Sequence, residues 1–206
     1  MFLLFCFLLK MKGKLFLISG PSGVGKGTVI TALKAKYPQF VYPISHTTRQ
    51  MRPGERDGEV YHFISKEEFE AEVAKGNFLE WAKVHGDNCY GTLKKPIMDA
   101  LEEGRIIIRE VDRQGFMSIR QVIRSENLIS IFLKAENEQK LLERIAKRGQ
   151  LPVEELQRRM ESARQEMQSA DLYNYQVWSL ENKIPECVAD TEKIILAEAV
   201  KAGLKV

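Results

Sequence analysis

The stretch ISGPSGVGKGTVI, Ile18 to Ile30, decides the fold. It follows the phosphate-loop pattern G-x-x-x-x-G-K-[ST] through Lys26. The next residue is Gly27, however, and the expected hydroxyl group stands one position later, on Thr28. Glycines let backbone N–H groups converge on phosphate oxygens, and the helix that follows adds its dipole. The stretch therefore predicts a nucleotide-binding loop of Gly20, Pro21, Ser22, Gly23, Val24, Gly25, Lys26, Gly27 and Thr28.

Short apolar runs alternate with helical patterns along most of the chain. The expected strands are Lys14–Ser19, Arg105–Val111, Leu128–Leu133 and Tyr175–Leu180. The expected helices are Lys26–Lys36, Pro96–Glu103, Gln114–Arg124, Glu136–Arg148, Val153–Ala170 and Thr191–Ala202. This order of strands and helices predicts an α/β fold, in which a mostly parallel sheet is flanked by helices.

The alternation breaks between residues 40 and 92, where Gly- and Pro-rich turns, short aromatic strands and a short helix near Lys66–Lys75 follow one another. We interpret 40–92 as a small α+β lobe inserted into a core of residues 11–39 and 93–206. The break KRGQLPVEE, at Lys147–Glu155, predicts the tip of a helical hairpin, which we take as a lid at about 144–160.

The first ten residues, MFLLFCFLLK, are apolar but too short to span a bilayer, which takes about twenty residues. They lack the basic start and the cleavage site of a secretory signal. We expect the folded protein to begin at Met11, so that 1–10 is an extra segment outside the fold and no membrane is involved.

Composition narrows the functional class. The net charge is only +3, with 31 basic and 28 acidic residues, so a bulk nucleic-acid binder is not expected. The three cysteines form no C-x-x-C pair, which favours the reducing cytoplasm over a disulfide framework or a zinc site.

The inserted lobe contains candidate phosphate ligands. Arg49 and Arg52 stand three residues apart in SHTTRQMRPGE, ahead of a Pro-Gly turn, and two guanidinium groups can clamp a phosphomonoester. Tyr61, Glu80 and the run Tyr90–Thr92 follow in the same lobe. Each of these residues alone also fits an ordinary solvated arginine, strand residue or surface charge.

Taken together, the motifs resemble the guanylate kinase family. The resemblance extends from Met11 through nearly the whole chain and rests on GPSGVGKGT, SHTTRQMRPGE followed by DGE-x-Y-x-F, FLEWA, YGT, VDRQG, and RIAKRG followed by RRM. It implies a phosphate-loop core with a GMP-binding lobe and a helical lid. It also implies the reaction ATP + GMP → ADP + GDP, assisted by Mg²⁺, in purine nucleotide metabolism, with dGMP as a further candidate acceptor and a homo-oligomer left open.

The same resemblance implies roles for individual residues. The GMP phosphate clamp matches Arg49, Arg52, Tyr61 and Tyr90. The positions that read guanine match Ser45, Glu80 and Thr92, with Gly91 between the last tyrosine and threonine, and Asp112 matches an acidic position near the base and the metal's water shell. The catalytic charges match Lys26, Arg144, Arg148 and Arg159, the last three being lid arginines.

Gly27 fits this resemblance, because nucleoside monophosphate kinases often have G-K-G-T at this point. In them Mg²⁺ is held mainly by nucleotide phosphates and water, with no dedicated protein metal site, as its reluctance to lose water allows. Three features depart from the family pattern. HGDNCYGT is one residue longer than usual before Tyr90 and has Cys89 where a tyrosine is expected, Glu110 stands where an aspartate is usual, and VWSLENKIP stands where an apolar strand ends in Asn-Asp. The last departure leaves the adenine contacts open.

Three alternatives remain. An inactive guanylate-kinase-like protein-binding domain tends to lose the loop lysine or the lid arginines, and this chain has both. A kinase for another nucleoside monophosphate would lack the carboxylate and hydroxyls that read guanine. A phosphate-loop switch protein would have no use for the clamp or the lid arginines.

Overall fold

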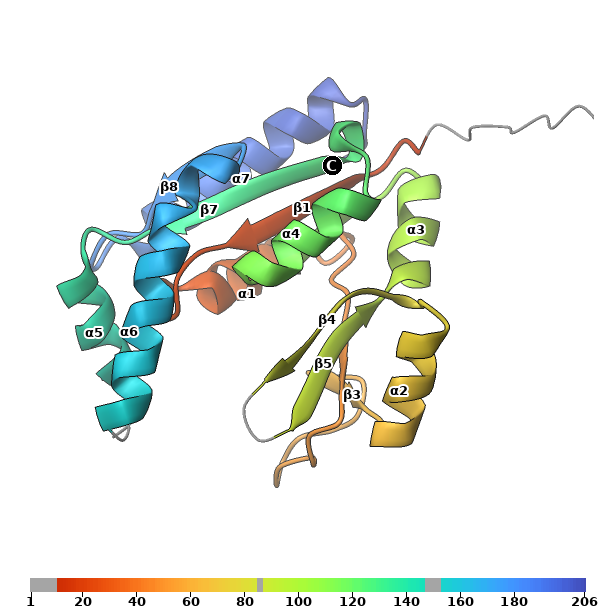
Figure 1. Cartoon of the computed structure of the whole chain (residues 1–206). Helices are drawn as coiled ribbons and strands as arrows, with labels where there is room; N and C mark the ends of the chain where they lie inside the picture. Colours follow the sequence, from red (N-terminus) through yellow and green to blue (C-terminus); the bar gives the residue numbers. More distant parts are fainter. Residues whose placement is uncertain (1–10, 85–86, 147–152) are drawn as a thin grey trace, which may run out of the picture.

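The computed structural model describes residues 11–84, 87–146 and 153–206. A parallel sheet in the order β6-β1-β7-β8 lies at the centre of this part of the chain (Figure 1). Its strands are β1 (Lys14–Ser19), β6 (Ile106–Glu110), β7 (Leu128–Lys134) and β8 (Tyr175–Trp178). The residues from Leu15 to Ile18 in β1 are fully buried, as expected for a central strand covered on both faces. The predicted parallel sheet is confirmed.

Helices cover both faces of this sheet. One face packs against α1 (Lys26–Lys36) and α7 (Ile184–Lys201), and the other packs against α3 (Lys94–Glu102) and α4 (Arg113–Val122). Because β6 and β7 both run parallel to β1, the carboxyl ends of these strands meet at one edge. Open α/β sheets bind ligands at that edge.

The inserted lobe has a second, mixed sheet in the order β3-β2-β5-β4. Its elements are β2 (Ser45–Thr47), β3 (Tyr61–Phe63), α2 (Lys66–Ala74), β4 (Phe78–Val84) and β5 (Asn88–Leu93). A small core of Phe69, Phe78 and Cys89 joins α2 to the sheet. At the start of the lobe, Phe40 packs in the main core and Val41 bridges to β6, so the lobe's own sheet begins only at Ser45.

Two further helices, α5 (Glu138–Ala146) and α6 (Val153–Gln168), lie side by side (Figure 1). Arg164 Nε of α6 donates to Glu138 Oε2 of α5 at 2.8 Å. Residues 147–152 of the hairpin tip predicted at Lys147–Glu155 lie outside the described residues, and residues 153–155 belong to α6. The lid remains a prediction. The 3₁₀ turns η1 (Ser125–Asn127) and η2 (Ala170–Leu172) precede β7 and β8.

The last helix begins earlier than predicted. We expected it at Thr191, whereas α7 begins at Ile184 with Pro185 in its first turn. Proline fits there because the first N–H groups of a helix have no partner within the helix. Among the described helices, none is long and apolar enough to cross a membrane.

Candidate active site

The phosphate loop connects β1 to α1. The backbone φ angles of Gly20, Gly23 and Gly25 are 142°, 83° and 107°, a region that residues other than glycine rarely adopt. A Cβ atom on Gly20 would lie 2.5 Å from the carbonyl oxygen of Leu133 in β7. The loop therefore requires glycine at its start, both for its dihedral angles and for its close approach to the neighbouring strand.

Lys26 is the first residue of α1 and its side chain lies across the loop. Its Nζ donates to the carbonyl oxygens of Gly20 at 2.6 Å and Pro21 at 3.3 Å. The same Nζ is 3.9 Å from the carboxylate of Glu110, at the end of β6. The ammonium group is thus positioned at the carboxyl edge of the sheet, where a phosphate held by the loop would lie.

Gly27 has a different character from the other loop glycines. A Cβ atom added there would meet nothing within 4 Å. Gly27 and Thr28 are both exposed, and Gly27 lines a cavity between the loop and the lobe. Neither packing nor a positive φ requires glycine at position 27.

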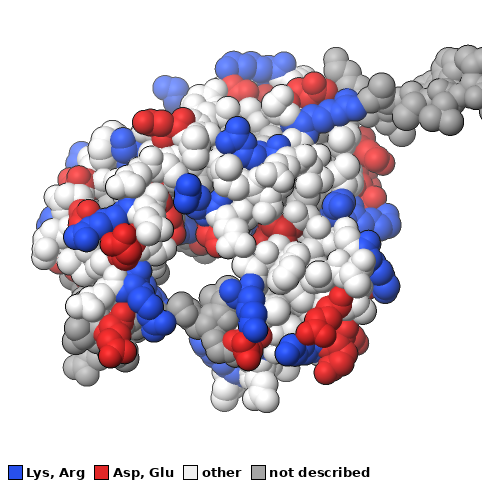
Figure 2. All heavy atoms as spheres, viewed as in Figure 1, with Lys and Arg blue, Asp and Glu red and all other residues white. Residues whose placement is uncertain are grey.

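This cavity has a volume of about 870 Å³ and lies between α1, the end of β6 and the lobe sheet. Figure 2 shows the molecule hollowed between the side of α5 and α6 and the side of β4 and β5, with basic side chains on both sides of the hollow. The predicted site residues that line the cavity are Gly27, Ser45, Tyr61, Glu80, Tyr90, Gly91 and Asp112.

The three predicted base-reading residues form one hydrogen-bonded cluster, although they come from three strands. Thr92 Oγ1 donates to Glu80 Oε1 at 2.6 Å. Nη2 of Arg109 donates both to Glu80 Oε1 and to Ser45 Oγ, each at 2.9 Å. Sequence reasoning missed Arg109. The only signal was an arginine directly after the three buried isoleucines of β6.

The predicted phosphate clamp is partly assembled. Arg49 forms a bidentate ion pair with Glu55, and its guanidinium lies 5.6 Å from the ring centre of Tyr61. Tyr61 and Tyr90 meet edge to face at 5.5 Å, and burial raises the pKa of the Tyr61 phenol. Arg52 is exposed, and the structure does not bring it among the residues that line the cavity.

Asp112 directly precedes α4 as its N-cap residue, and its Oδ1 accepts a hydrogen bond from the backbone N–H of Gly115 at 2.7 Å. This is a helix cap, so part of its carboxylate is occupied by a structural role. Glu166 of α6 lies in the same region, and burial raises its pKa, while the charge of Lys26 acts in the opposite direction.

The three predicted lid arginines differ in what the structure shows of their positions. Arg144 of α5 donates to the carbonyl oxygen of Ser179 at 3.0 Å and to that of Val24 at 3.4 Å, so it ties α5 to the phosphate loop. Arg159 is half-buried on α6 and interacts with neighbouring groups. Arg148 lies outside the described residues.

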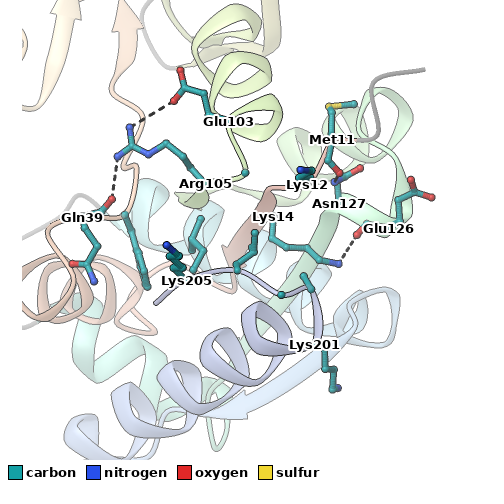
Figure 3. Close-up of a pocket in the computed structure, with 16 residues that line it drawn as sticks. Met11, Lys12, Lys14, Gln39, Glu103, Arg105, Glu126, Asn127, Lys201 and Lys205 are labelled. Atoms are coloured by element: carbon teal, nitrogen blue, oxygen red, sulfur yellow. Dashed lines mark hydrogen bonds and ion pairs between the residues drawn. The ribbon is translucent and has the colours of Figure 1, made fainter. Parts of the chain in front are cut away.

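A second cavity, of about 850 Å³, opens at the amino ends of the central strands, on the opposite edge of the sheet (Figure 3). Its lining includes lysine and arginine side chains, but Lys14 donates to the carbonyl of Glu126 and Arg105 to that of Gln39. It contains none of the predicted site residues, so the cavity beside the phosphate loop is the candidate active site.

The described residues hold no group of three or more His, Cys, Asp or Glu side chains that could bind a metal ion. Glu110 and Asp112 nevertheless bring two carboxylates to the edge of the sheet beside the loop, and carboxylate oxygens are the ligands that Mg²⁺ prefers. The residues fit an Mg²⁺ ion that arrives with the nucleotide and keeps most of its water.

Comparison with known proteins agrees with this architecture. The family model "Guanylate kinase" matches residues 12–198. The guanylate kinase of Latilactobacillus sakei is 41% identical over 191 residues, which cover 92% of each chain. That of Carboxydothermus hydrogenoformans is 38% identical over 190 residues, 92% of this chain and 91% of the relative.

A crystal structure of guanylate kinase from Anaplasma phagocytophilum superimposes with a TM-score of 0.68 at 29% identity, covering 90% of this chain and 86% of that one. Together with these relatives, a phosphate loop at the edge of a parallel sheet, facing a second lobe across a cavity, identifies the class as the nucleoside monophosphate kinases. The matched length and identity then place the protein more narrowly. The chain belongs to the guanylate kinase family.

Proposed function

We propose that the protein transfers the terminal phosphoryl group of ATP to GMP, giving ADP and GDP, and that dGMP is a second acceptor. The observation that supports this most directly is the hydrogen-bonded cluster of Ser45, Glu80 and Thr92, of which Ser45 and Glu80 line the cavity beside the phosphate loop. Guanine presents its N1–H and N2 amino donors side by side, and Glu80 supplies the acceptor that they require. Adenine presents an acceptor at N1 and would face the carboxylate lone pair to lone pair.

In this proposal the acceptor oxygen belongs to GMP, so the protein needs no nucleophile of its own. Catalysis then consists of alignment and of neutralising the charge that spreads over the transferred group. Arg49, Tyr61 and Tyr90 hold the GMP phosphate from the lobe side, with Arg52 recruited from the surface. Lys26, Arg144, Arg148 and Arg159 supply positive charge from the loop and the lid.

ATP binds the loop of residues 20–28 through converging backbone N–H groups. Mg²⁺ when bound neutralises phosphate charge, and we assign Glu110 and Asp112 to its water shell. Closure of the lid would exclude the water that otherwise hydrolyses ATP. We propose that this chemistry takes place in the cytoplasm and involves neither nucleic acid nor a membrane.

A coupled assay of ADP release tests this function. The purified chain is supplied with ATP and Mg²⁺ and with GMP, dGMP, AMP, CMP or UMP in turn. We expect turnover with GMP and dGMP and a much lower rate with the other three. Release of ADP without preference for guanine would favour another nucleoside monophosphate kinase. No release with any acceptor, from a protein that still binds GMP in calorimetry, would favour a binding domain.

A further inference from the structure

Arg109 lies where the two sheets of the molecule meet. It belongs to β6 of the central sheet, while Ser45 and Glu80, which its Nη2 contacts, belong to the lobe. Only 13% of the Arg109 side chain and 13% of the Glu80 side chain are exposed. Its Nη1 donates at 3.3 Å to the carbonyl oxygen of Pro43, in the segment that leads into the lobe.

We propose that Arg109 is a positioning residue for base recognition, which holds the carboxylate of Glu80 and the hydroxyl of Ser45 in the orientation that reads guanine. This inference rests on the function proposed above. It concerns how one residue acts through two others, since the direct contacts with the base are assigned to Glu80 and Ser45.

The hydrogen bonds around Glu80 show what Arg109 fixes. Oε1 accepts from both Thr92 and Arg109, which uses both of its lone pairs. Among the described residues, no group donates to Oε2. This oxygen lies 3.6 Å from the point where a Cβ atom added to Gly115 would stand. The rotamer that Arg109 and Thr92 impose therefore leaves Oε2 available to the donors of the base.

Charge supports the same role. A carboxylate in a half-closed cavity is costly to desolvate unless a cation accompanies it. The guanidinium of Arg109 balances the charge of the Glu80 carboxylate, so a neutral base can cover the pair without burying a net charge. A lysine would keep the charge, but its three N–H donors share one nitrogen, whereas Arg109 reaches Pro43 through Nη1 and Ser45 and Glu80 through Nη2.

Folding alone does not account for an arginine at this position. Its Nε is buried and has no hydrogen-bond partner among the residues that the structure describes, which is unfavourable. The preceding residues Ile106, Ile107 and Ile108 are buried and apolar. An apolar residue at position 109 would continue the strand without that unpaired donor, and buried ion pairs are often replaceable by apolar groups with no loss of stability.

Steady-state kinetics with GMP and IMP test the proposal, because IMP lacks only the N2 amino group. We expect Arg109→Leu and Arg109→Lys to raise the KM for GMP by about 10- to 100-fold, the scale of a lost charge-assisted hydrogen bond, with a smaller change in kcat and an unchanged KM for ATP. The ratio of kcat/KM for GMP to kcat/KM for IMP should fall. Arg105→Leu is the matched control, since Arg105 lies four residues earlier and outside the cavity. It should leave the KM for GMP, the KM for ATP and kcat unchanged.

Combining each variant with Glu80→Gln separates positioning from general packing. If Arg109 acts through Glu80, replacing Arg109 in the Glu80→Gln background should raise the KM for GMP by a much smaller factor than it does in the parent enzyme. The proposal would be overturned if the effects of the two substitutions on the KM for GMP were independent, so that their factors multiplied in the double variant. It would also be overturned if the KM for ATP rose as much as the KM for GMP.

Arg109→Lys keeps the buried charge and provides the readout if Arg109→Leu does not fold. An enzyme that phosphorylates GMP and keeps its GMP KM and its GMP/IMP ratio in the Arg109→Lys variant would also refute the role of Arg109. A parent chain inactive on GMP would instead refute the proposed function.

Discussion

Arg49 and Glu55 face each other across a tight turn in a bidentate ion pair, with Nη1 and Nη2 at 3.0 and 2.9 Å from the two carboxylate oxygens. The same carboxylate accepts the backbone N–H of Arg52 at 2.8 Å. The hydrogen bonds to Arg49 are the main cause of a lowered pKa for Glu55, and the pKa of Arg49 is raised in turn. Glu55 thus orders the loop that carries both predicted phosphate ligands, and it holds Arg49 against Tyr61.

The first prediction concerns this clamp. Arg49→Ala should raise the KM for GMP by about 10- to 100-fold, because a charge-assisted contact to the phosphate is lost. Isothermal calorimetry with GMP measures the effect on binding directly. Arg56→Ala is the control, since Arg56 is exposed and pairs only at 3.6 Å with Glu59. Unchanged GMP binding by the Arg49 variant would show that the clamp is wrongly assigned.

The second prediction concerns Lys26. Lys26→Ala should lower kcat by roughly 100- to 1,000-fold while the KM for GMP changes little, because the charge acts mainly in the transition state. Lys95→Ala is the control, since Lys95 lies on α3, is exposed and pairs with Asp99. Single-turnover kinetics with ATP and GMP separates the chemical step from product release. A variant that retains its kcat but loses GMP affinity would contradict the assignment.

The third prediction compares two glycines of the same loop. Gly20→Ala forces a Cβ to within 2.5 Å of the Leu133 carbonyl at a φ of 142° and should destabilise the fold by at least roughly 1–3 kcal/mol. Gly27→Ala adds a methyl group in open space within the first turn of α1 and should stabilise it by about 0.5–1 kcal/mol. Urea unfolding of both variants measures the two effects. Equal destabilisation of both would contradict the described loop geometry.

The fourth prediction concerns pH. The pKa of His46 is lowered, mainly by burial and to a smaller extent by the charge of His62. Asp57 and Glu72 oppose this shift. The unfolded state therefore takes up a proton at a higher pH than the folded state. The stability that comes from neutral His46 is complete above its unfolded pKa, near 6.5, and is lost as the pH falls through the folded value.

Urea unfolding at about pH 7.5 and about pH 5.5 tests this, since that interval includes the unfolded pKa. His46→Gln should show a smaller loss of stability over the interval than the parent chain. The pKa values of Asp57 and Glu72 are both lowered, so these carboxylates titrate at more acidic pH. An equally steep loss in the variant would assign the pH dependence to other groups.

Much of the fold was predictable because its signals are local. Leu15–Ile18 in β1 is continuously apolar because both faces of this strand are covered. Helix α1 begins at Lys26, inside the phosphate-loop motif that the sequence shows. The short strand β2 and the polar strand β5 were missed, because neither has an alternating pattern and each depends on pairing with distant residues. The early start of α7 was missed because Pro185 also fits a turn.

The site was predictable in its parts but not in its connections. Ser45, Glu80 and Thr92 came from the family resemblance, and the structure brings them together. Arg109 is 29 positions from Glu80 and lies in a different sheet, so only the tertiary packing of the lobe on the core joins them. The bidentate contact of Arg49 with Glu55 likewise depends on a turn whose geometry the residue letters do not specify.

Replacement of Glu80 by glutamine tests the central claim most directly. The amide keeps the size of the side chain but turns one acceptor into a donor, which opposes the N1–H and amino group of guanine. The measurement is kcat/KM for GMP and for AMP, each with ATP, in the parent chain and in Glu80→Gln. We predict that the parent chain prefers GMP by roughly 10⁴-fold or more, and that the variant loses most of its GMP activity while its low AMP rate barely falls. If GMP activity and the ratio of GMP to AMP both survive the substitution, Glu80 does not read the base and the proposed specificity is wrong.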